Sequence, residues 1–367
     1  MSSRNLVIIY AKYKNYCLFL KRTMIATYQQ YILNFKQASG TSRGVLKTKE
    51  TWFLILEHQG KKGVGECGLF RGLSADDVSN YEEKLQWVCA NIHLGLDLLL
   101  AELIMFPSIQ FGLEQAFISL QGEHSFLLFP SEFTQGNDTI PINGLIWMGT
   151  EAFMKQQIKD KIEAGFSCIK MKIGAIDFKT ELELLKSIRK EFSAEDIELR
   201  VDANGAFKPS EALEKLKILS HFDLHSIEQP IKQGQIQEMA RLCENTPLPI
   251  ALDEELIGVF DVTKKEDLLL TINPQYIILK PSLVGGFTGS QNWIDLAEKQ
   301  NIGWWITSAL ESNVGLNAIA QFTYTLQSKL PQGLGTGSLF VNNFESPLQV
   351  KNGTLQYQNN NNWNFKL

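Results

Sequence analysis

The feature that most constrains this chain is an alternation of apolar and amphipathic segments between residues 142 and 340. Short apolar runs predict strands, and amphipathic stretches such as 178–192 and 210–219 predict the helices between them. Strict alternation of this kind is typical of a parallel sheet covered by helices. The predicted strands are 142–147, 168–173, 197–201, 226–228, 249–252, 276–279, 303–307 and a weak, glycine-rich one at 333–339.

The number and spacing of these units select one architecture within the α/β class. Eight units in roughly 200 residues fit a (β/α) barrel better than an open, doubly wound sheet. No Gly-x-Gly-x-x-Gly motif follows the first predicted strand, which argues against a dinucleotide-binding fold. We therefore expect a TIM-type barrel of seven or eight units, spanning residues 136–340.

A different pattern precedes the barrel, over residues 24–135. Strand-like segments with a tight turn at 60–63 come first, and helical segments follow. This order predicts an α+β capping domain in which the polar, glycine-bearing segment 38–46 forms a mobile lid loop. The segment 341–367 contains an Asn-Gly hairpin signal, and we expect it to pack on the capping domain and complete it.

The first 23 residues differ from the rest, because they carry five basic side chains and no acidic one. Lys12 and Lys14 interrupt the apolar run that a secretory signal needs. Met24 follows directly, so we expect translation to start there and residues 1–23 to be a non-native or disordered leader. A mature N-terminus upstream of Met24, found by mass spectrometry of the native protein, would contradict this expectation.

Composition narrows the functional class. Hydrophobic residues make up 44% and charged residues 20%, which is ordinary for a globular enzyme. The net charge of −5 argues against a nucleic-acid partner, and no apolar run reaches the ~18 residues of a membrane helix. The five cysteines are widely spaced, which excludes a Cys-x-x-Cys site and indicates reduced thiols in the cytoplasm. We expect a cytoplasmic enzyme that acts on a small molecule; the sequence leaves its oligomeric state open.

Polar residues stand at the ends of successive predicted strands, one βα unit apart. Asp202, Glu228, Asp253 and Lys280 follow one another at intervals of 26, 25 and 27 residues, and Ser308 comes 28 later. Equivalent strand ends in a barrel face the same mouth, so these side chains should converge. Three carboxylates without a thiol or an imidazole suit a hard cation such as Mg²⁺ rather than zinc.

Each of these residues alone has a simpler interpretation. An acid after a strand is most often a helix N-cap or a solvated loop residue, and a lone strand lysine lies most often at the surface. Lys170 and Lys172, however, share one face of their predicted strand, which places both inside the barrel if Met171 and Ile173 face the helices. The common period of the whole set argues against coincidence.

Five motifs in this order and spacing resemble the muconate-lactonising-enzyme subgroup of the enolase superfamily. They are Lys-Met-Lys at 170–172, Arg-Val-Asp-Ala-Asn at 200–204, Ile-Glu-Gln-Pro at 227–230, Ala-Leu-Asp-Glu-Glu at 251–255 and Leu-Lys-Pro at 279–281. The resemblance extends from Tyr28 to the C-terminus. Residues 65–74 and 308–316 further resemble the o-succinylbenzoate synthase family within that subgroup, which acts in menaquinone biosynthesis.

The resemblance implies a role for each of these residues. Asp202, Glu228 and Asp253 would bind one Mg²⁺, or Mn²⁺ in its place, which stabilises the enediolate formed when the substrate's α-proton leaves. Lys172 would abstract this proton and return it to the departing hydroxyl in a syn dehydration. Lys280, on the opposite face, would stay cationic and stabilise the intermediate. The product would be 2-succinylbenzoate, formed from 2-succinyl-6-hydroxy-2,4-cyclohexadiene-1-carboxylate.

Further residues are expected around this centre. Asn204 and Glu254 lie next to the predicted ligands and would support them, although a turn residue and a solvated acid explain them equally well. Arg43 lies in the predicted lid, where an exposed loop arginine is the simpler interpretation. The residues expected to contact substrate are Lys170, Ser308, Gly335, Thr336 and Arg43.

Other activities use the same residues. Paired lysines also suit an N-succinylamino acid racemase, another racemase or epimerase, or a cycloisomerase of the subgroup. Dipeptide epimerases usually carry an Asp-x-Asp pair near the last strand, and this chain has Gly-Thr-Gly-Ser at 335–338, which argues against that branch. A barrel without activity is also an alternative, but the complete set of three carboxylates and two lysines argues against it.

Overall fold

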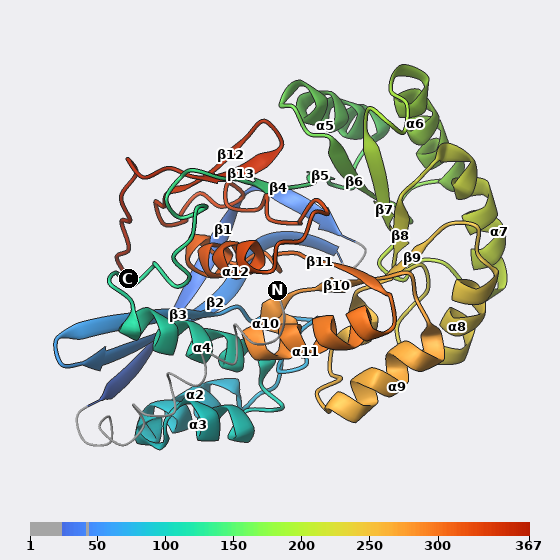
Figure 1. The fold of residues 1–367 in the computed structure, drawn as a ribbon. Coiled ribbons are helices and arrows are strands. Elements are labelled where there is room, and N and C mark those ends of the chain that lie inside the picture. Colours follow the sequence, from blue (N-terminus) through green and yellow to red (C-terminus); the bar gives the residue numbers. More distant parts are fainter. Residues whose placement is uncertain (1–23, 42–43) are drawn as a thin grey trace.

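The computed structural model describes residues 24–41 and 44–367. The leader and start-site prediction for residues 1–23 and the predicted contact residue Arg43 therefore lie outside the described residues. The described chain forms two packed units, a capping unit of strands and helices and a larger barrel (Figure 1). The domain boundaries drawn at residues 135 and 340 stay predictions.

The capping unit consists of a three-stranded antiparallel sheet and the helices that cover one of its faces. The sheet order is β1–β2–β3. Trp52, Leu54 and Leu56 alternate along β2, and their side chains are buried against the helices because one face of the sheet is apolar. The elements are β1 (Ile25–Thr41), β2 (Gly44–His58), β3 (Lys61–Cys67), α2 (Tyr81–Ala90), η1 (Ile92–Leu94), α3 (Leu96–Glu102) and α4 (Pro107–Gln121).

The segment 38–46, expected as a loop, is largely strand. β1 ends at Thr41 and β2 begins at Gly44, and Ser39 pairs with Leu46 in a long hairpin. The pairing register shifts between Asn34 and Ser39, which is where a bulge bends the hairpin. Polar residues continue a ladder here because the pairing uses backbone groups rather than side chains. A lid function for this hairpin stays a prediction.

The barrel sheet contains seven parallel strands in the order β11–β10–β9–β8–β7–β6–β5, so each strand pairs with its neighbour in the chain. Helices α5 to α9 form an outer layer around these strands (Figure 1). The strands are β5 (Gly144–Ile146), β6 (Cys168–Lys172), β7 (Glu198–Asp202), β8 (Ser226–Glu228), β9 (Ile250–Leu252), β10 (Tyr276–Leu279) and β11 (Gly303–Ile306). The helices are α5 (Glu151–Glu163), α6 (Phe178–Glu191), α7 (Pro209–Leu219), η2 (Ser220–Phe222), α8 (Ile236–Asn245), η3 (Glu254–Leu256), α9 (Val262–Ile272), α10 (Pro281–Val284), α11 (Gly286–Lys299) and α12 (Asn313–Thr325).

Two residues close the barrel between its first and last strands. Gln332 bridges in parallel to Ile142 on one side, and Gly333 bridges to Thr307 on the other. The backbone N–H of Gln332 donates to Pro141 O at 2.8 Å. The strand predicted at 333–339 is therefore wrong in extent: the eighth position is this two-residue segment, which we call the barrel seam. Two residues are too few to form the apolar run by which a strand is predicted from sequence.

The C-terminal segment contacts both units. β12 (Leu348–Lys351) and β13 (Thr354–Tyr357) form the predicted hairpin, and β13 pairs with β4 (Ile140–Pro141) just before the barrel. Further along, the rings of Phe365 and Phe53 lie 5.4 Å apart, which brings the chain end onto the capping sheet. Aromatic rings at this separation pack edge to face and stabilise the contact.

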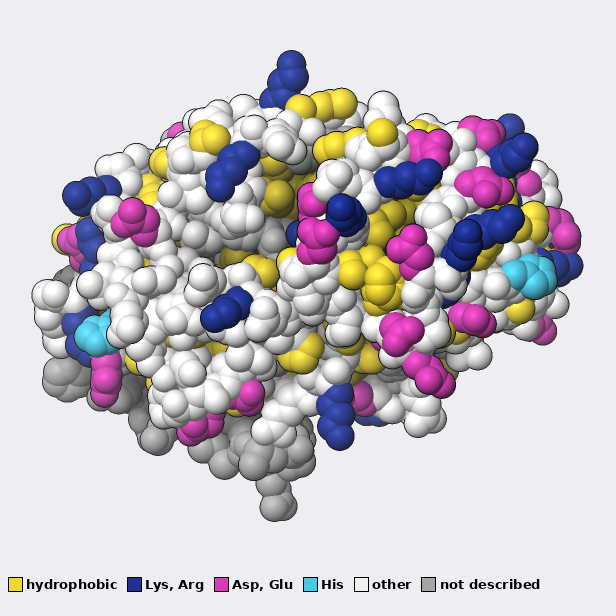
Figure 2. Space-filling view, turned by 90° about the horizontal axis from the view of Figure 1, so that it is seen from above, with side chains coloured by type: hydrophobic (Ala, Val, Ile, Leu, Met, Phe, Trp, Pro, Cys, Tyr) yellow, Lys and Arg dark blue, Asp and Glu magenta, His cyan; other side chains and the backbone are white. Residues whose placement is uncertain are grey.

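On the face shown in Figure 2, basic and acidic side chains are interspersed rather than gathered by sign. None of the helices in the described part of the chain combines the length and the apolar character that crossing a membrane requires. The apolar surface lies mainly inside, where the strands of the barrel pack against its helices.

Candidate active site

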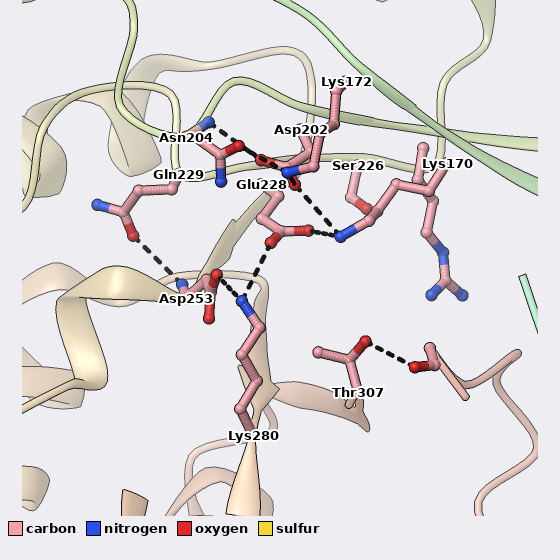
Figure 3. Close-up of polar contacts among 12 residues, drawn as sticks. Lys170, Lys172, Asp202, Asn204, Ser226, Glu228, Gln229, Asp253, Lys280 and Thr307 are labelled. Atoms are coloured by element: carbon pink, nitrogen blue, oxygen red, sulfur yellow. Dashed lines mark hydrogen bonds and ion pairs between the residues drawn. The ribbon is translucent and has the colours of Figure 1, made fainter. Parts of the chain in front are cut away.

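The strand ends of the barrel converge as the sequence predicts. On β6, Ile169 and Met171 point outward into the apolar core, so Lys170 and Lys172 point into the barrel. In the parallel register, Lys172 is opposite Asp202, and Asp202 is opposite Glu228. Figure 3 shows these side chains directed toward one another from neighbouring strands.

Two lysines of β6 neutralise two of the carboxylates. Lys170 Nζ lies 2.6 Å from Glu228 Oε2 and 3.3 Å from Asp202 Oδ2. Lys172 Nζ donates to Asp202 Oδ2 at 2.8 Å and to Asn204 Oδ1 at 2.6 Å. These contacts fix the direction of both ammonium groups, because each is held by two acceptors.

Lys280 approaches the same cluster from the opposite side (Figure 3). It follows β10 directly, and its Nζ pairs with Asp253 Oδ2 and lies 4.0 Å from Glu228 Oε1. Asp253 follows β9 in the same way. The carboxylates therefore lie between Lys170 and Lys172 on one side and Lys280 on the other.

Burial and neighbouring charge shift the pKa values of these groups in opposite directions. Burial alone would raise the pKa of Asp202, but the ammonium groups of Lys172 and Lys170 override it and lower the pKa. Burial, together with the charge of Asp202, raises the pKa of Glu228 to about 8. Burial alone would lower the pKa of Lys280, and the negative charge of Asp253 raises it instead. Lys280 is therefore held in its charged form.

The carboxylate cluster has the chemistry of a divalent-cation site, although each acid faces a lysine in the structure. Glu228 Oε1 is buried and accepts no hydrogen bond from the described residues; the ammonium group of Lys280 lies 4.0 Å from it. All donors are oxygens, which suit a hard cation. Within the described ranges, no three His, Cys, Asp or Glu side chains are arranged to hold a metal ion. The residues fit a cation by their oxygen donors and by this buried oxygen, which accepts no hydrogen bond.

The residues next to the cluster form a hydrogen-bonded support. Asn204 Nδ2 donates to Glu254 Oε1 at 3.0 Å, which brings together the two residues expected to support the ligands. Gln229 was not predicted: its Oε1 accepts from the backbone N–H of Asp253 at 3.2 Å, and its Nε2 donates to Glu255 Oε2 at 2.9 Å. Gln229 and Glu255 belong to two of the motifs given above, at or near the predicted ligands. This position in the sequence could have identified them as supporting residues.

A pocket lies above the cluster, at the mouth of the barrel. Apolar side chains from both units form part of its wall, including Phe70 and Leu46 of the capping unit and Trp147 and Leu310 of the barrel. Lys170, Lys172, Asp202 and Lys280 are also among its lining residues. The pocket therefore presents both apolar and charged side chains to a bound molecule.

The predicted contact residues Ser308, Gly335 and Thr336 line this pocket. The hydroxyl of Ser308 donates to Glu311 Oε2 at 2.6 Å and accepts from Thr336 Oγ1 at 3.0 Å. The only proton of this hydroxyl is therefore used within the protein. Its oxygen also accepts from the backbone N–H of Leu310 at 3.0 Å, so Ser308 presents neither a free donor nor a free acceptor to the pocket.

A barrel whose strand ends bring lysines and carboxylates together below a pocket is an arrangement typical of an enzyme that acts on a small molecule. Residues 153–360 match the family described as enolase C-terminal domain-like. The chain belongs to the enolase superfamily. It is 46% identical, over 90% of its own length and 98% of the relative's, to an o-succinylbenzoate synthase from Desulfotalea psychrophila. It is 28% identical, over 72% of its length and 76% of the relative's, to an L-Ala-D/L-Glu epimerase from Francisella tularensis subsp. novicida.

Solved structures agree with this membership. The crystal structure of MenC from Desulfotalea psychrophila matches with a TM-score of 0.81 and 44% identity, over 91% of this chain and 99% of that one. Muconate lactonizing enzyme from Pseudomonas fluorescens matches with a TM-score of 0.78 over 93% of this chain and 96% of that one. At 20% identity, the second match shows the shared fold alone.

Proposed function

We propose that this protein is an o-succinylbenzoate synthase, a hydro-lyase that converts 2-succinyl-6-hydroxy-2,4-cyclohexadiene-1-carboxylate to 2-succinylbenzoate. The observation that carries the proposal is the 46% identity with a synthase over nearly the whole of both chains. The pocket supports it, because aromatic and aliphatic side chains border a cluster of charged groups. Such a pocket suits a ring that bears a carboxylate. The product places the enzyme in menaquinone biosynthesis.

Lys172 is the proposed base of the reaction. Its Nζ is aimed by Asp202 and Asn204, and it lines the pocket. In its neutral form, it takes the α-proton of the substrate and delivers it to the departing hydroxyl. One C–H bond and one C–O bond break, a ring double bond forms, and water leaves. Because one group serves both steps, the proton and the hydroxyl leave from the same face.

Lys280 is the proposed electrostatic partner on the other face of the substrate. The negative charge of Asp253 raises its pKa, which keeps the ammonium group charged at neutral pH. A fixed positive charge at this place stabilises the electron density that spreads over the ring when the proton leaves. Lys170, which lies between the two carboxylates Asp202 and Glu228, would attract the substrate carboxylate.

Asp202, Glu228 and Asp253 are the proposed ligands of one Mg²⁺, with Mn²⁺ as a substitute. The cation would supply positive charge to the substrate carboxylate and so make the neighbouring C–H more acidic. Asn204, Glu254 and the unpredicted Gln229 would hold the ligands in place through the hydrogen bonds described above.

The direct test is a dehydration assay on the cyclohexadiene substrate, followed by the loss of diene absorbance. We expect rapid turnover with Mg²⁺ and loss of turnover with EDTA, restored by added Mg²⁺ or Mn²⁺. Absence of turnover with metal present would refute the synthase. Turnover that EDTA leaves unchanged would refute the metal ligands and leave the reaction itself standing.

A racemase is the second candidate, because Lys172 and Lys280 lie on opposite sides of the same cluster. Two opposed amino groups can remove a proton from one face of an α-carbon and return it on the other. We would offer N-succinylamino acids in D₂O and follow deuterium uptake at the α-carbon by NMR. Uptake with inversion, without diene turnover, would move the assignment to the racemase.

We place the enzyme in the cytoplasm. The four cysteines in the described part of the chain are free thiols, and Cys67, Cys168 and Cys243 are buried. Burial raises the pKa of the Cys243 thiol to about 12, which keeps it protonated and unreactive. Fractionation of the native host cells, followed by immunodetection, should find the protein in the cytoplasmic fraction; a membrane-bound or exported pool would contradict the placement.

A further inference from the structure

Two buried carboxylates of the capping unit reach the barrel, and the mechanism proposed above uses neither. Glu66 lies on β3 and is 0% exposed, and Glu114 lies on α4 and is 1% exposed. Each meets the beginning of a barrel helix. A buried carboxylate requires several donors to compensate for lost hydration, and both residues obtain these donors from the first turn of a helix on the other unit.

Glu114 binds the N-terminus of α11. Its Oε2 accepts from the backbone N–H of Phe287 at 2.5 Å, and its Oε1 accepts from the N–H of Thr288 at 3.2 Å and from the Thr288 hydroxyl. Gly286 makes room for this contact: its φ is +73°, and a Cβ at this position would lie 2.1 Å from Glu114 Oε2. The chain thus has glycine where any other residue would displace the carboxylate.

Glu66 binds the N-terminus of α12 in the same manner. Its Oε1 accepts from the N–H of Ser312 at 2.9 Å, and its Oε2 accepts from the N–H of Gly315 at 2.8 Å. The hydroxyls of Ser312 and Thr51 complete the set. A glycine again makes room, since a Cβ on residue 315 would lie 2.9 Å from Glu66 Oε2.

Both helices come directly after strand ends that carry site residues. Lys280 is separated from α11 only by the short α10 and Gly285. Ser308, which lines the pocket, stands four residues before Ser312. A helix N-terminus carries partial positive charge, so a carboxylate placed there fixes the position of the first turn. The two carboxylates therefore hold the two segments from the side of the capping unit.

We propose that Glu114 and Glu66 are positioning residues for the reaction. Glu114 sets the position of Lys280 through α11, and Glu66 sets the pocket wall at Ser308 through α12. The capping unit thus acts on the reacting centre as well as covering it. The kinetic test of this inference rests on the proposed function. The test by hydrogen–deuterium exchange rests on the structure alone.

The test compares Glu114→Gln and Glu66→Gln with the wild-type enzyme. Glutamine keeps the volume but turns an NH₂ group toward the helix donors. For Glu114→Gln we expect kcat to fall by about 100-fold with KM within about twofold, because the displaced group acts in the reaction rather than in binding. For Glu66→Gln we expect KM to rise by about tenfold with a smaller change in kcat, because the displaced segment is pocket wall.

Asp261→Asn is the matched control, because Asp261 caps α9 within the barrel by accepting from Lys264 N–H at 3.1 Å. It should leave kcat and KM near the wild-type values. Equal kinetic losses in this control would assign the effect to helix destabilisation in general and overturn the proposal. So would wild-type kinetics in both glutamine variants.

Two further measurements keep the proposal testable if a variant folds poorly or the enzyme has another activity. Thr288→Val removes one donor to Glu114 and keeps the carboxylate, so it should reproduce the fall in kcat in milder form. Hydrogen–deuterium exchange of Glu114→Gln should increase over residues 280–290 and not over 262–272. Absence of wild-type dehydration would refute the proposed function; unchanged exchange over 280–290 would refute the positioning role.

Discussion

Lys172 and Lys280 differ in their partners, and this difference supports the different roles proposed for them. Lys172 is held by one carboxylate and one amide oxygen, whereas Lys280 pairs with Asp253 and lies near Glu228. The negative charge of Asp253 and Glu228 raises the pKa of Lys280 and favours its charged form, whereas the partners of Lys172 aim its Nζ into the pocket. The base is therefore expected on β6 and the fixed cation after β10.

The Lys172→Ala variant tests this assignment. We expect dehydration and α-proton exchange to fall by about 10³-fold, because a positioned acid–base group contributes on the order of 10² to 10⁴ in rate. The unfolding transition should stay close to that of the wild type. Lys186→Ala, an exposed lysine of α6, is the control and should keep full activity. Retained exchange in Lys172→Ala would contradict the base assignment.

Gln229 offers a second test at this scale, because it holds the backbone next to Asp253 and pairs with Glu255. The Gln229→Leu variant should weaken the affinity for Mg²⁺ by about tenfold, since residues that orient ligands typically contribute 10–100-fold to metal affinity. Calorimetric titration of the purified protein measures this affinity. Gln237→Leu, at an exposed position of α8, is the control. An unchanged affinity in Gln229→Leu would show that Asp253 is held by other contacts.

Strands and their ends were the predictable elements, and contacts between units were not. Buried parallel strands appear in the sequence as continuous apolar runs. Polar residues that follow these runs at equal intervals are expected at the same end of the barrel. The barrel seam is too short to produce an apolar run. The strands over 38–46 are held by backbone pairing, so their polar side chains gave no strand pattern in the sequence. The contacts of Glu66 and Glu114 join residues about 170 or more positions apart, so they cannot be predicted from a local sequence pattern.

The N-terminus of α4 carries a pH-dependent contact within the capping unit. Asp76 Oδ2 accepts from the N–H of Ser108 at 2.9 Å and from its hydroxyl at 2.6 Å. Burial raises the pKa of Asp76 to about 6, so between about pH 4 and pH 6 the folded state holds a proton that the unfolded state releases. The contribution of Asp76 to stability is therefore greatest at low pH and decreases as the pH rises through 6.

The Asp76→Asn variant should remove this dependence. We expect its free energy of unfolding to fall less than that of the wild type between pH 4 and pH 6, because the amide does not ionise. Urea unfolding at several pH values provides the measurement, with the exposed Asp97→Asn as the control. An identical slope in Asp76→Asn and wild type would show that other groups dominate this range.

At the scale of the whole molecule, the C-terminal residues tie the two units together. The ring of Trp363 stacks on Phe126 at 4.2 Å, and Phe365 packs against Phe53. The Phe365→Ala variant should lower the free energy of unfolding by about 1–2 kcal/mol, less than a fully buried phenylalanine, because its side chain is only half-buried. Chemical denaturation checks this value, with the exposed Leu270→Ala as the control. No loss in Phe365→Ala would mean that the chain end adds nothing to the cap.

The barrel seam separates the seven-stranded sheet from the pocket residues that follow it in the chain. The carboxylates and lysines lie on the strands of the seven-stranded sheet or directly after them. A shift of one of these strands would disturb the strands paired with it. Gln332 and Gly333 form one bridge each and are further held by hydrogen bonds to the strands on both sides. The pocket residues Gly335 and Thr336 follow shortly after them in the chain. Gly335 and Thr336 lie outside the sheet, so substitutions there should change the pocket while the strands stay in register. The shape of the pocket and the proposed proton-transfer groups can therefore be altered separately.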